Sequence, residues 1–400
     1  MKRTAILSSI VVAGLAVAGI AAAQRGGAPP PAKPGVLEHV KGNLWKIFDG
    51  CSCGNTTFYV TKKGVVLVDT KVANNGQAIL DLVKTVTDKP VIMVINTHSH
   101  PDHNGSNKEI KAIYPNIDVV AHENLKKRVE TALAAPPGPR GPGADPSQNP
   151  NITFSTKRSL TIGKDDRIDL YYFGRGHTDN DIFVVFPKVR TMAIGDLMAW
   201  NMAPLIDPGT NGSAIALADT LEKAQKGIKG VDFVIEGHGN VNTWQGMVNM
   251  TAFDRAIVTE AKKAYDAGGT PDDALAVLQK NPQFAVFLTH DLKPGMEYGS
   301  SPAARALMNI NVAFQEMAGE PVTNNFGGAL KATDKHKGGS DPAALAPPRP
   351  AALGAGPSGG GRPPGGGAGG PGGPPGGGAG GPPAGGPPAG GPPAGPRPGA

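Results

Sequence analysis

The sequence has only two cysteines, Cys51 and Cys53, among its 400 residues. Two cysteines are too few for the framework of several disulfides that holds many small secreted domains together. They are separated by a single residue, a spacing at which a bridge is strained but possible in an oxidising compartment. We therefore expect a structural or merely local role for this pair.

The sequence also lacks long apolar runs, with one exception at its start. Lys2 and Arg3 precede an apolar stretch over residues 5–20, and three alanines at residues 21–23 follow it. A basic start, an apolar segment and small residues at its end are typical of a cleaved secretory signal peptide. The alternative, a membrane anchor, is disfavoured because the stretch is short for a span and rich in Ala and Gly. We predict an exported protein, periplasmic or secreted, without a membrane span after cleavage.

Concentrated charge of one sign is absent as well. The net charge is +6, but the 39 basic and 33 acidic residues are spread along the chain. The densest basic run, residues 126–128, has the spacing of a solvated helix face, and no basic patch is interleaved with aromatic residues. We therefore expect a small-molecule substrate and no nucleic-acid partner, while the oligomeric state stays open.

Glycine and proline, in contrast, are abundant and concentrated toward the end of the chain. Residues 341–400 are mostly Gly, Pro and Ala and contain a five-residue repeat, a period that differs from the three-residue repeat of collagen. Such a segment cannot bury a core and is expected to be disordered. The predicted organisation is a signal peptide (1–23), a flexible leader (24–35), a main globular domain (36–250), a helical extension (251–325) and a low-complexity tail (326–400).

The predicted extension has the periodicity of amphipathic helices. Apolar side chains recur there at every fourth position: Phe253, Ile257, Ala261 and Tyr265. Residues 270–273 and 301–302 carry helix-start signals with Pro at the first helical position. Shaping of a cleft, dimerisation and stability are the alternative roles of this extension.

The segment with the most evident chemistry follows the apolar run of residues 91–95. It contains three imidazoles and a carboxylate within six residues: His98, His100, Asp102 and His103. These groups would repel one another when charged and would lose water on burial. A divalent cation removes both costs, because neutral His and ionised Asp are ligands that zinc accepts.

Three later motifs repeat this arrangement. Each follows a short run rich in β-branched or aromatic residues and ends at a potential ligand beside glycine: His177, Asp196 and His238. Strand ends with tight Gly turns are positions where sheets present functional groups. A capping residue is the alternative for Asp196, and an ordinary turn histidine is the alternative for His238.

The order HxHxDH, GHT, GD and GHG, over roughly residues 40–250, resembles the metallo-β-lactamase-fold hydrolase superfamily. The resemblance implies an α/β fold, a four-layer αββα sandwich with the ligands along one rim. It also implies that Asp69, which ends the apolar run of residues 65–68, supports the metal loop. Cys51 and Cys53 then lie at a hairpin tip near the active site, so substrate contact is an alternative to their local role.

The resemblance also implies a set of ligands for two Zn²⁺ ions. The first ion would be bound by His98, His100 and His177. The second would be bound by Asp102, His103 and His238. Asp196 would bridge the two ions, which would share a water that becomes the nucleophile.

Further residues are candidates for supporting roles in this site. Asp102 is expected to steer the nucleophile or to relay its proton. Thr178, Asp179 and Asn180 are expected to support the ligands, and Asn180 is also a candidate to stabilise an oxyanion.

The function implied by the resemblance is hydrolysis of a small ester, thioester, lactone or β-lactam. Export and the GHT-Asp-Asn element favour a β-lactamase by resemblance. The Asp at position 196 is instead similar to the glyoxalase and lactonase branches, since lactamases have Cys or no bridging carboxylate at that position. One alternative is a persulfide or sulfur dioxygenase with a single iron on His98, His177 and Asp196. Another is a non-enzymatic metal-binding protein, against which the completeness of the ligand set argues.

Overall fold

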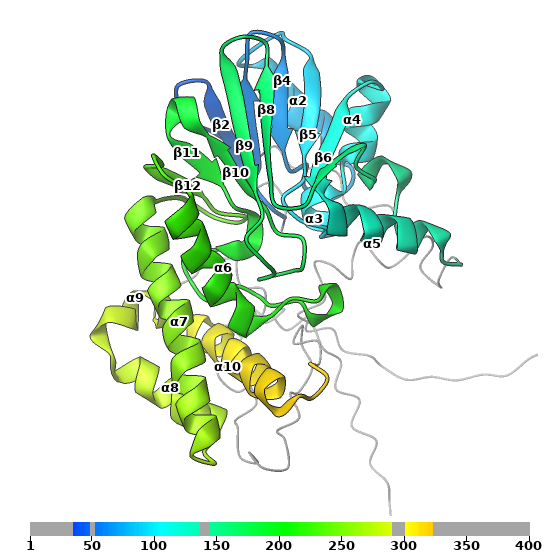
Figure 1. The fold of residues 1–400 in the computed structure, drawn as a ribbon. Helices are drawn as coiled ribbons and strands as arrows, with labels where there is room; N and C mark the ends of the chain where they lie inside the picture. Colours follow the sequence, from blue (N-terminus) through cyan, green and yellow to red (C-terminus); the bar gives the residue numbers. More distant parts are fainter. Residues whose placement is uncertain (1–34, 49–52, 137–143, 290–300, 323–400) are drawn as a thin grey trace, which may run out of the picture. The chain divides into compact units, whose positions relative to one another are not determined.

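The computed structural model describes residues 35–48, 53–136, 144–289 and 301–322 (Figure 1). The predicted signal peptide, nearly all of the predicted leader, Cys51 and the low-complexity tail lie outside these ranges, so the predictions about them stay predictions. Within the described ranges, no helix combines the length and the apolar character needed to cross a membrane.

The first half of the described chain forms a seven-stranded sheet whose spatial order equals its sequence order. Its strands are β1 (Val36–Lys41), β2 (Leu44–Phe48), β3 (Thr56–Val60), β4 (Val65–Val68), β5 (Val91–Ile95), β6 (Asp118–His122) and β7 (Ile152–Phe154). Strands β1 to β4 pair antiparallel and β4 to β7 pair parallel. The parallel crossovers contain α2 (Gly76–Lys84), α3 (Pro101–Asn104), α4 (Asn107–Ile113) and α5 (Glu123–Ala134).

The second half forms a six-stranded sheet. Its strands are β8 (Lys157–Ile162), β9 (Asp166–Tyr171), β10 (Phe183–Phe186), β11 (Thr191–Ala193), β12 (Phe233–Ile235) and β13 (Val241–Thr243). They lie in the order β13-β12-β11-β10-β9-β8. Only β11 and β12 pair parallel within this sheet, and the connection between them contains α6 (Ala214–Gly227).

The two sheets pack face to face through apolar side chains. Val66 and Val68 of β4 point into the core between the sheets, where they meet residues such as Val184 of β10. Val65 and Leu67, the alternate residues of β4, belong to the core under the helices of the first sheet. Successive side chains of a strand point to opposite faces, so a strand that is covered on both sides is apolar throughout.

Helices cover the other face of the second sheet. They are α6, α7 (Trp244–Asp266), α8 (Pro271–Lys280), α9 (Ala285–Leu288) and α10 (Pro302–Ala318). Figure 1 shows α7, α8 and α10 lying together beside this sheet. One core contains Met192 of β11, Phe253 of α7 and Leu307 of α10. The four layers confirm the predicted αββα sandwich, and α7 crosses the predicted boundary at residue 250.

Candidate metal centre

The histidine-rich segment turns sharply after β5. Pro101 begins the short helix α3, so Asp102 and His103 lie within one helical turn, and His100 is its N-cap with extended backbone angles. This change of direction brings side chains from a six-residue segment into one place. His98, Asp102 and His103 are buried there.

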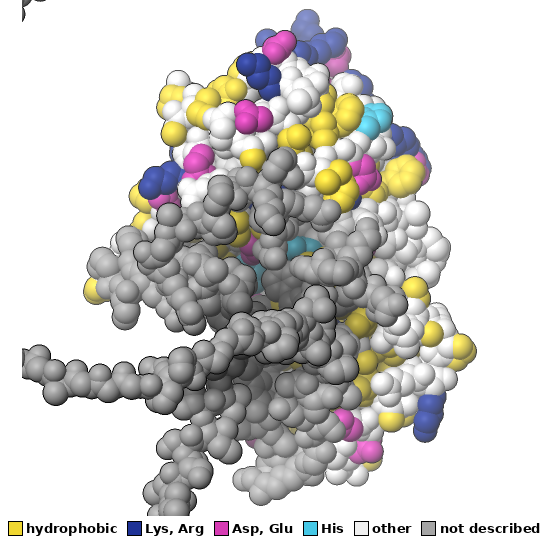
Figure 2. All heavy atoms as spheres, turned by 180° about the vertical axis from the view of Figure 1, so that it is seen from behind, with side chains coloured by type: hydrophobic (Ala, Val, Ile, Leu, Met, Phe, Trp, Pro, Cys, Tyr) yellow, Lys and Arg dark blue, Asp and Glu magenta, His cyan; other side chains and the backbone are white. Residues whose placement is uncertain are grey.

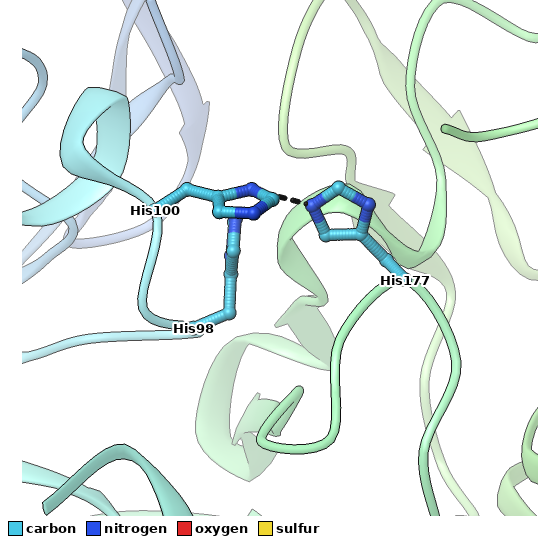
Figure 3. Close-up of side chains that lie close together, drawn as sticks. All are labelled: His98, His100 and His177. Atoms are coloured by element: carbon cyan, nitrogen blue, oxygen red, sulfur yellow. Dashed lines mark hydrogen bonds between the residues drawn. The ribbon is translucent and has the colours of Figure 1, made fainter. Parts of the chain in front are cut away.

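Three imidazoles from distant parts of the chain form a first group. His98 and His100 come from the segment after β5, and His177 comes from the loop between β9 and β10. Their ligand nitrogens lie within 4.8 Å of one another. His100 Nδ1 is 2.8 Å from His177 Nε2 (Figure 3). The structure thus brings together the three residues that the resemblance assigned to one ion.

A second group contains Asp102, His103 and His238. Their ligand atoms also lie within 4.8 Å of one another. His103 Nε2 is 3.2 Å from His238 Nε2, and His238 Nε2 is 3.3 Å from Asp102 Oδ2. This group also matches the residues that the resemblance assigned to one ion.

Asp196, which follows β11, lies between the two groups. One carboxylate oxygen is 3.1 Å from His103 Nε2. The other is 3.3 Å from His238 Nε2 and 3.7 Å from His177 Nε2. All seven candidate ligands therefore meet in one place, and Figure 2 shows histidine and acidic side chains together near the middle of one face.

Two histidines of the first group are neutral because of their surroundings. Burial, together with the neighbouring imidazoles, holds the pKa of His98 well below its usual value and lowers the pKa of His177 to about 4. His98 Nε2 is buried without a hydrogen-bond partner among the described residues. A buried lone pair without a partner is costly, and a cation is the partner that a neutral imidazole accepts. The donor set therefore fits a divalent metal.

The carboxylates determine the charge of the second group. Burial lowers the pKa of His103 and of His238, but Asp196 and Asp102 outweigh burial and keep both values above the usual range. Burial raises the pKa of Asp102, but His103 and His238 outweigh it and bring the value to about 2. Ionised carboxylates held beside imidazoles are suited to bind a cation in place of protons.

Asp69 orients His103 from behind, as predicted for the residue that supports the metal loop. Asp69 Oδ2 is 2.8 Å from His103 Nδ1, and Oδ1 accepts a hydrogen bond from the backbone N–H of Thr97. Asp69 has a φ of 61°, so the chain leaves β4 through a left-handed residue.

Two glycines leave the space that the candidate ligands occupy. A Cβ at Gly54 would overlap the ring of His103, and a Cβ at Gly237 would overlap the carboxylate of Asp196. The glycines of these turns therefore permit close approach of the backbone to the site. The sequence pattern indicates the Gly-flanked turn at His238, but no pattern marks Gly54 as part of the site.

The sequence also gave no indication of two groups that contact the first triad from outside. Asp207 Oδ2 lies 2.7 Å from His100 Nε2, and Leu205 O accepts a hydrogen bond of 2.6 Å from His177 Nδ1. Burial raises the pKa of Asp207, but hydrogen bonding to His100 and the charge of that ring lower it to about 2. Asp207 is followed by Pro and Gly, a pattern that indicates only a turn.

The predicted supporting residues after His177 bond to one another and to neighbouring segments. Thr178 donates hydrogen bonds from its hydroxyl and backbone N–H to Asp181. Asn180 is fully buried, and its Nδ2 donates to Asp179 Oδ1 and Ser99 Oγ, so both of its N–H groups are engaged. The oxyanion role of Asn180 stays a prediction.

His122 lies apart from the candidate centre. Its Nδ1 accepts a hydrogen bond from the backbone N–H of Asn124, and its ring stacks on Tyr172 with centroids 3.8 Å apart. These contacts give His122 a structural role at the start of α5. The sequence had placed it outside the ligand set.

Comparisons with known proteins agree with this architecture. Residues 50–199 match the sequence model of the metallo-beta-lactamase superfamily. The chain is 28% identical over 211 residues to a metallo-beta-lactamase type 2 of Elizabethkingia meningoseptica, which covers 50% of this chain and 78% of that relative. It is 27% identical over 198 residues to metallo-beta-lactamase IND-1 of Chryseobacterium indologenes, which covers 48% of this chain and 73% of that relative.

A solved structure of similar fold is the sec-alkylsulfatase Pisa1 from Pseudomonas sp., with a TM-score of 0.52 at 16% identity. The similarity covers 70% of this chain and 50% of that one, so this chain spans half of its length. At this identity the likeness concerns the fold. The family match over residues 50–199, the αββα layers and the cluster of candidate ligands at their edge agree with one another: this part of the chain has the sequence pattern and the fold of the metallo-β-lactamase superfamily, whose members are typically metal-dependent hydrolases.

Proposed function

We propose that this protein is a binuclear zinc-dependent hydrolase that acts on a small ester, thioester, lactone or β-lactam. The observation that carries this proposal is the position of Asp196, which faces His103 and His238 of the second group and His177 of the first. A carboxylate between two groups of three ligands is suited to bridge two cations.

Zinc ions bound there would lower the pKa of a bound water and polarise the scissile carbonyl. The protein supplies neutral imidazoles at His98 and His177, which are ready to bind a metal without first losing a proton. Asp102 keeps a side chain that is 12% exposed, and its Oδ2 lies 3.3 Å from His238 Nε2. In this position Asp102 would steer the nucleophile or relay its proton.

Two observations favour different substrates within this class. The curated relatives, at 27–28% identity, are named metallo-beta-lactamases, which supports a β-lactam. An Asp at position 196 instead resembles the lactonase and glyoxalase branches, which supports a lactone or thioester. The apolar segment of residues 5–20 supports export, so we place the reaction in a periplasm or outside the cell.

Metal analysis and a substrate panel test the proposal together. Purified protein is expected to contain two zinc ions per chain and to hydrolyse one of nitrocefin, a homoserine lactone or a glutathione thioester. His98→Ala should reduce both zinc content and activity, whereas His39→Ala, which changes an exposed histidine bonded to Gly42 O, should change neither. One iron per chain, or full activity in His98→Ala, would contradict the proposal.

A further inference from the structure

Asp207 contacts the ring nitrogen of His100 that faces away from the other two histidines of the first group. Asp207 Oδ2 lies 2.7 Å from His100 Nε2, and the two side chains are only 11% and 17% exposed. With Nε2 engaged, Nδ1 is the ring nitrogen that remains, and it lies 2.8 Å from His177 Nε2. The carboxylate therefore selects which nitrogen of His100 faces the site.

The Asp207 carboxylate is fixed by contacts other than His100. Asp207 is the N-cap of the 3-10 turn Pro208–Thr210. Its Oδ1 accepts a hydrogen bond of 2.9 Å from Gly209 N, and its Oδ2 accepts one of 2.8 Å from Thr210 Oγ1. Its backbone N–H donates to His177 O. The carboxylate is thus held in place by its own loop.

The same loop orients a second histidine of the first group. His177 Nδ1 donates to Leu205 O over 2.6 Å. In the second group, by contrast, the outer nitrogen of His103 contacts Asp69, which follows β4. The loop of residues 205–210 therefore acts on the first group and leaves the second to a different part of the chain.

We propose that Asp207 is a positioning residue for the first group. It fixes His100 as the tautomer with hydrogen on Nε2, so that Nδ1 is free to bind the metal. This inference rests on the proposed metal site and deepens it by naming the side chain that sets the orientation of one ligand.

Asp207→Asn separates this role from helix capping. Asn caps a helical turn as well as Asp does, so its Oδ1 retains the bond to Gly209 N. Its NH₂ group then faces His100 Nε2, which must become an acceptor, and the ring hydrogen moves to Nδ1. Asp145→Asn is the matched control, because Asp145 also caps a 3-10 turn that begins with Pro and has Lys108 as its ion-pair partner.

Two measurements on the full-length protein test the proposal. Long-range ¹H–¹⁵N spectra of histidine-labelled protein, recorded before zinc is added, should show hydrogen on Nε2 of His100 in the wild type and on Nδ1 in Asp207→Asn. Zinc titration against a chromophoric chelator should show one of the two ions bound about 10–100-fold more weakly in Asp207→Asn. The affinity for the other ion, the melting temperature and all properties of Asp145→Asn should match the wild type.

The outcomes distinguish this inference from the proposed function. Wild-type protein that binds no zinc would overturn the metal site. An unchanged His100 tautomer in Asp207→Asn would overturn the role of Asp207, whether or not zinc binds. An equal loss of zinc affinity in Asp145→Asn would also overturn it, because capping alone would then explain the effect.

Discussion

Gly54 has no room for a side chain, because a Cβ there would overlap the ring of His103. We predict that Gly54→Ala displaces this ring and weakens zinc binding by at least about tenfold, the effect typical of disturbing the support of a ligand. Zinc titration measures this effect. Gly268→Ala is the control, since Gly268 has a φ of 71° and a Cβ there would meet no atom within 4 Å, so its replacement should lower stability but leave zinc affinity unchanged. Unchanged zinc binding in Gly54→Ala would contradict the account.

Asp254 of α7 is buried, and neither of its carboxylate oxygens has a hydrogen-bond partner among the described residues. Burial raises its pKa well above the usual value. A carboxyl group whose pKa is raised by folding lowers the free energy of unfolding as the pH rises. The loss begins at about pH 4, where the group ionises in the unfolded chain, and ends above its pKa in the folded protein. Each unit of difference in pKa costs about 1.4 kcal/mol.

Asp254→Asn should therefore stabilise the protein at pH 8 relative to the wild type, with a gain that shrinks toward pH 4. Urea denaturation of both proteins across this range gives the free energy of unfolding. Two stability curves that run parallel over the whole pH range would show that Asp254 does not titrate with folding.

The sequence was sufficient to propose the candidate ligands and, through the resemblance, the support that Asp69 gives, but not the groups that contact the first group from outside. The ligand candidates are recognisable because each follows a strand-like run and carries a metal-binding side chain beside a turn. The contacts of Asp207 and Leu205 depend instead on how a loop 107 residues from His100 packs against it, and no local pattern encodes that packing. For the same reason the sequence did not reveal that Asn180 donates its amide N–H groups to Asp179 and Ser99.

Among the helices, α8 begins with a capping box. The Thr270 side chain accepts a hydrogen bond from Asp273 N, and the Asp273 side chain accepts one from Thr270 N. Thr270→Ala should lower the free energy of unfolding by about 1 kcal/mol, because it leaves a backbone N–H without its acceptor. Chemical denaturation measures the change. Thr270→Ser keeps the hydroxyl and should stay close to the wild type, so equal losses in the two variants would contradict this explanation.

The elements with strong local signals were predictable. The predicted helix starts at residues 270–272 and 301–302 are confirmed by α8 and α10. Phe253, Ile257 and Ala261 are buried along α7, as their spacing predicted. The helical pattern indicates a start near residue 247, and the structure begins α7 at Trp244, because Thr243 caps the helix directly after β13.

At the scale of the whole molecule, the described helices after β13 belong to the core of the second sheet. Leu307, Ile310 and Phe314 of α10 are buried in that core. Burying a side chain of this kind contributes about 1.5–3 kcal/mol, and a typical protein has only about 5–15 kcal/mol of net stability. The layered architecture was predictable from the family resemblance. The core that α7 and α10 share with the second sheet was not, because it depends on which faces of the helices meet.

Two truncations test the role of α10. A variant that ends at residue 322 keeps α10 and all seven candidate ligands, so it should unfold cooperatively and bind zinc as the full chain does. A variant that ends at residue 289 lacks α10 and should lose cooperative unfolding. Thermal denaturation followed by circular dichroism compares the two. Cooperative unfolding of the shorter variant at the temperature of the full chain would show that α10 is dispensable for the core.

The central claim, that seven side chains converge to bind two cations, is tested most directly by a crystal structure of the zinc-loaded protein with anomalous diffraction at the zinc edge. We predict two anomalous peaks, one about 2.0–2.1 Å from nitrogen atoms of His98, His100 and His177, and one at similar distances from Asp102, His103 and His238. Asp196 should contact both peaks. Peaks bound elsewhere, or no peak among these side chains, would contradict the claim.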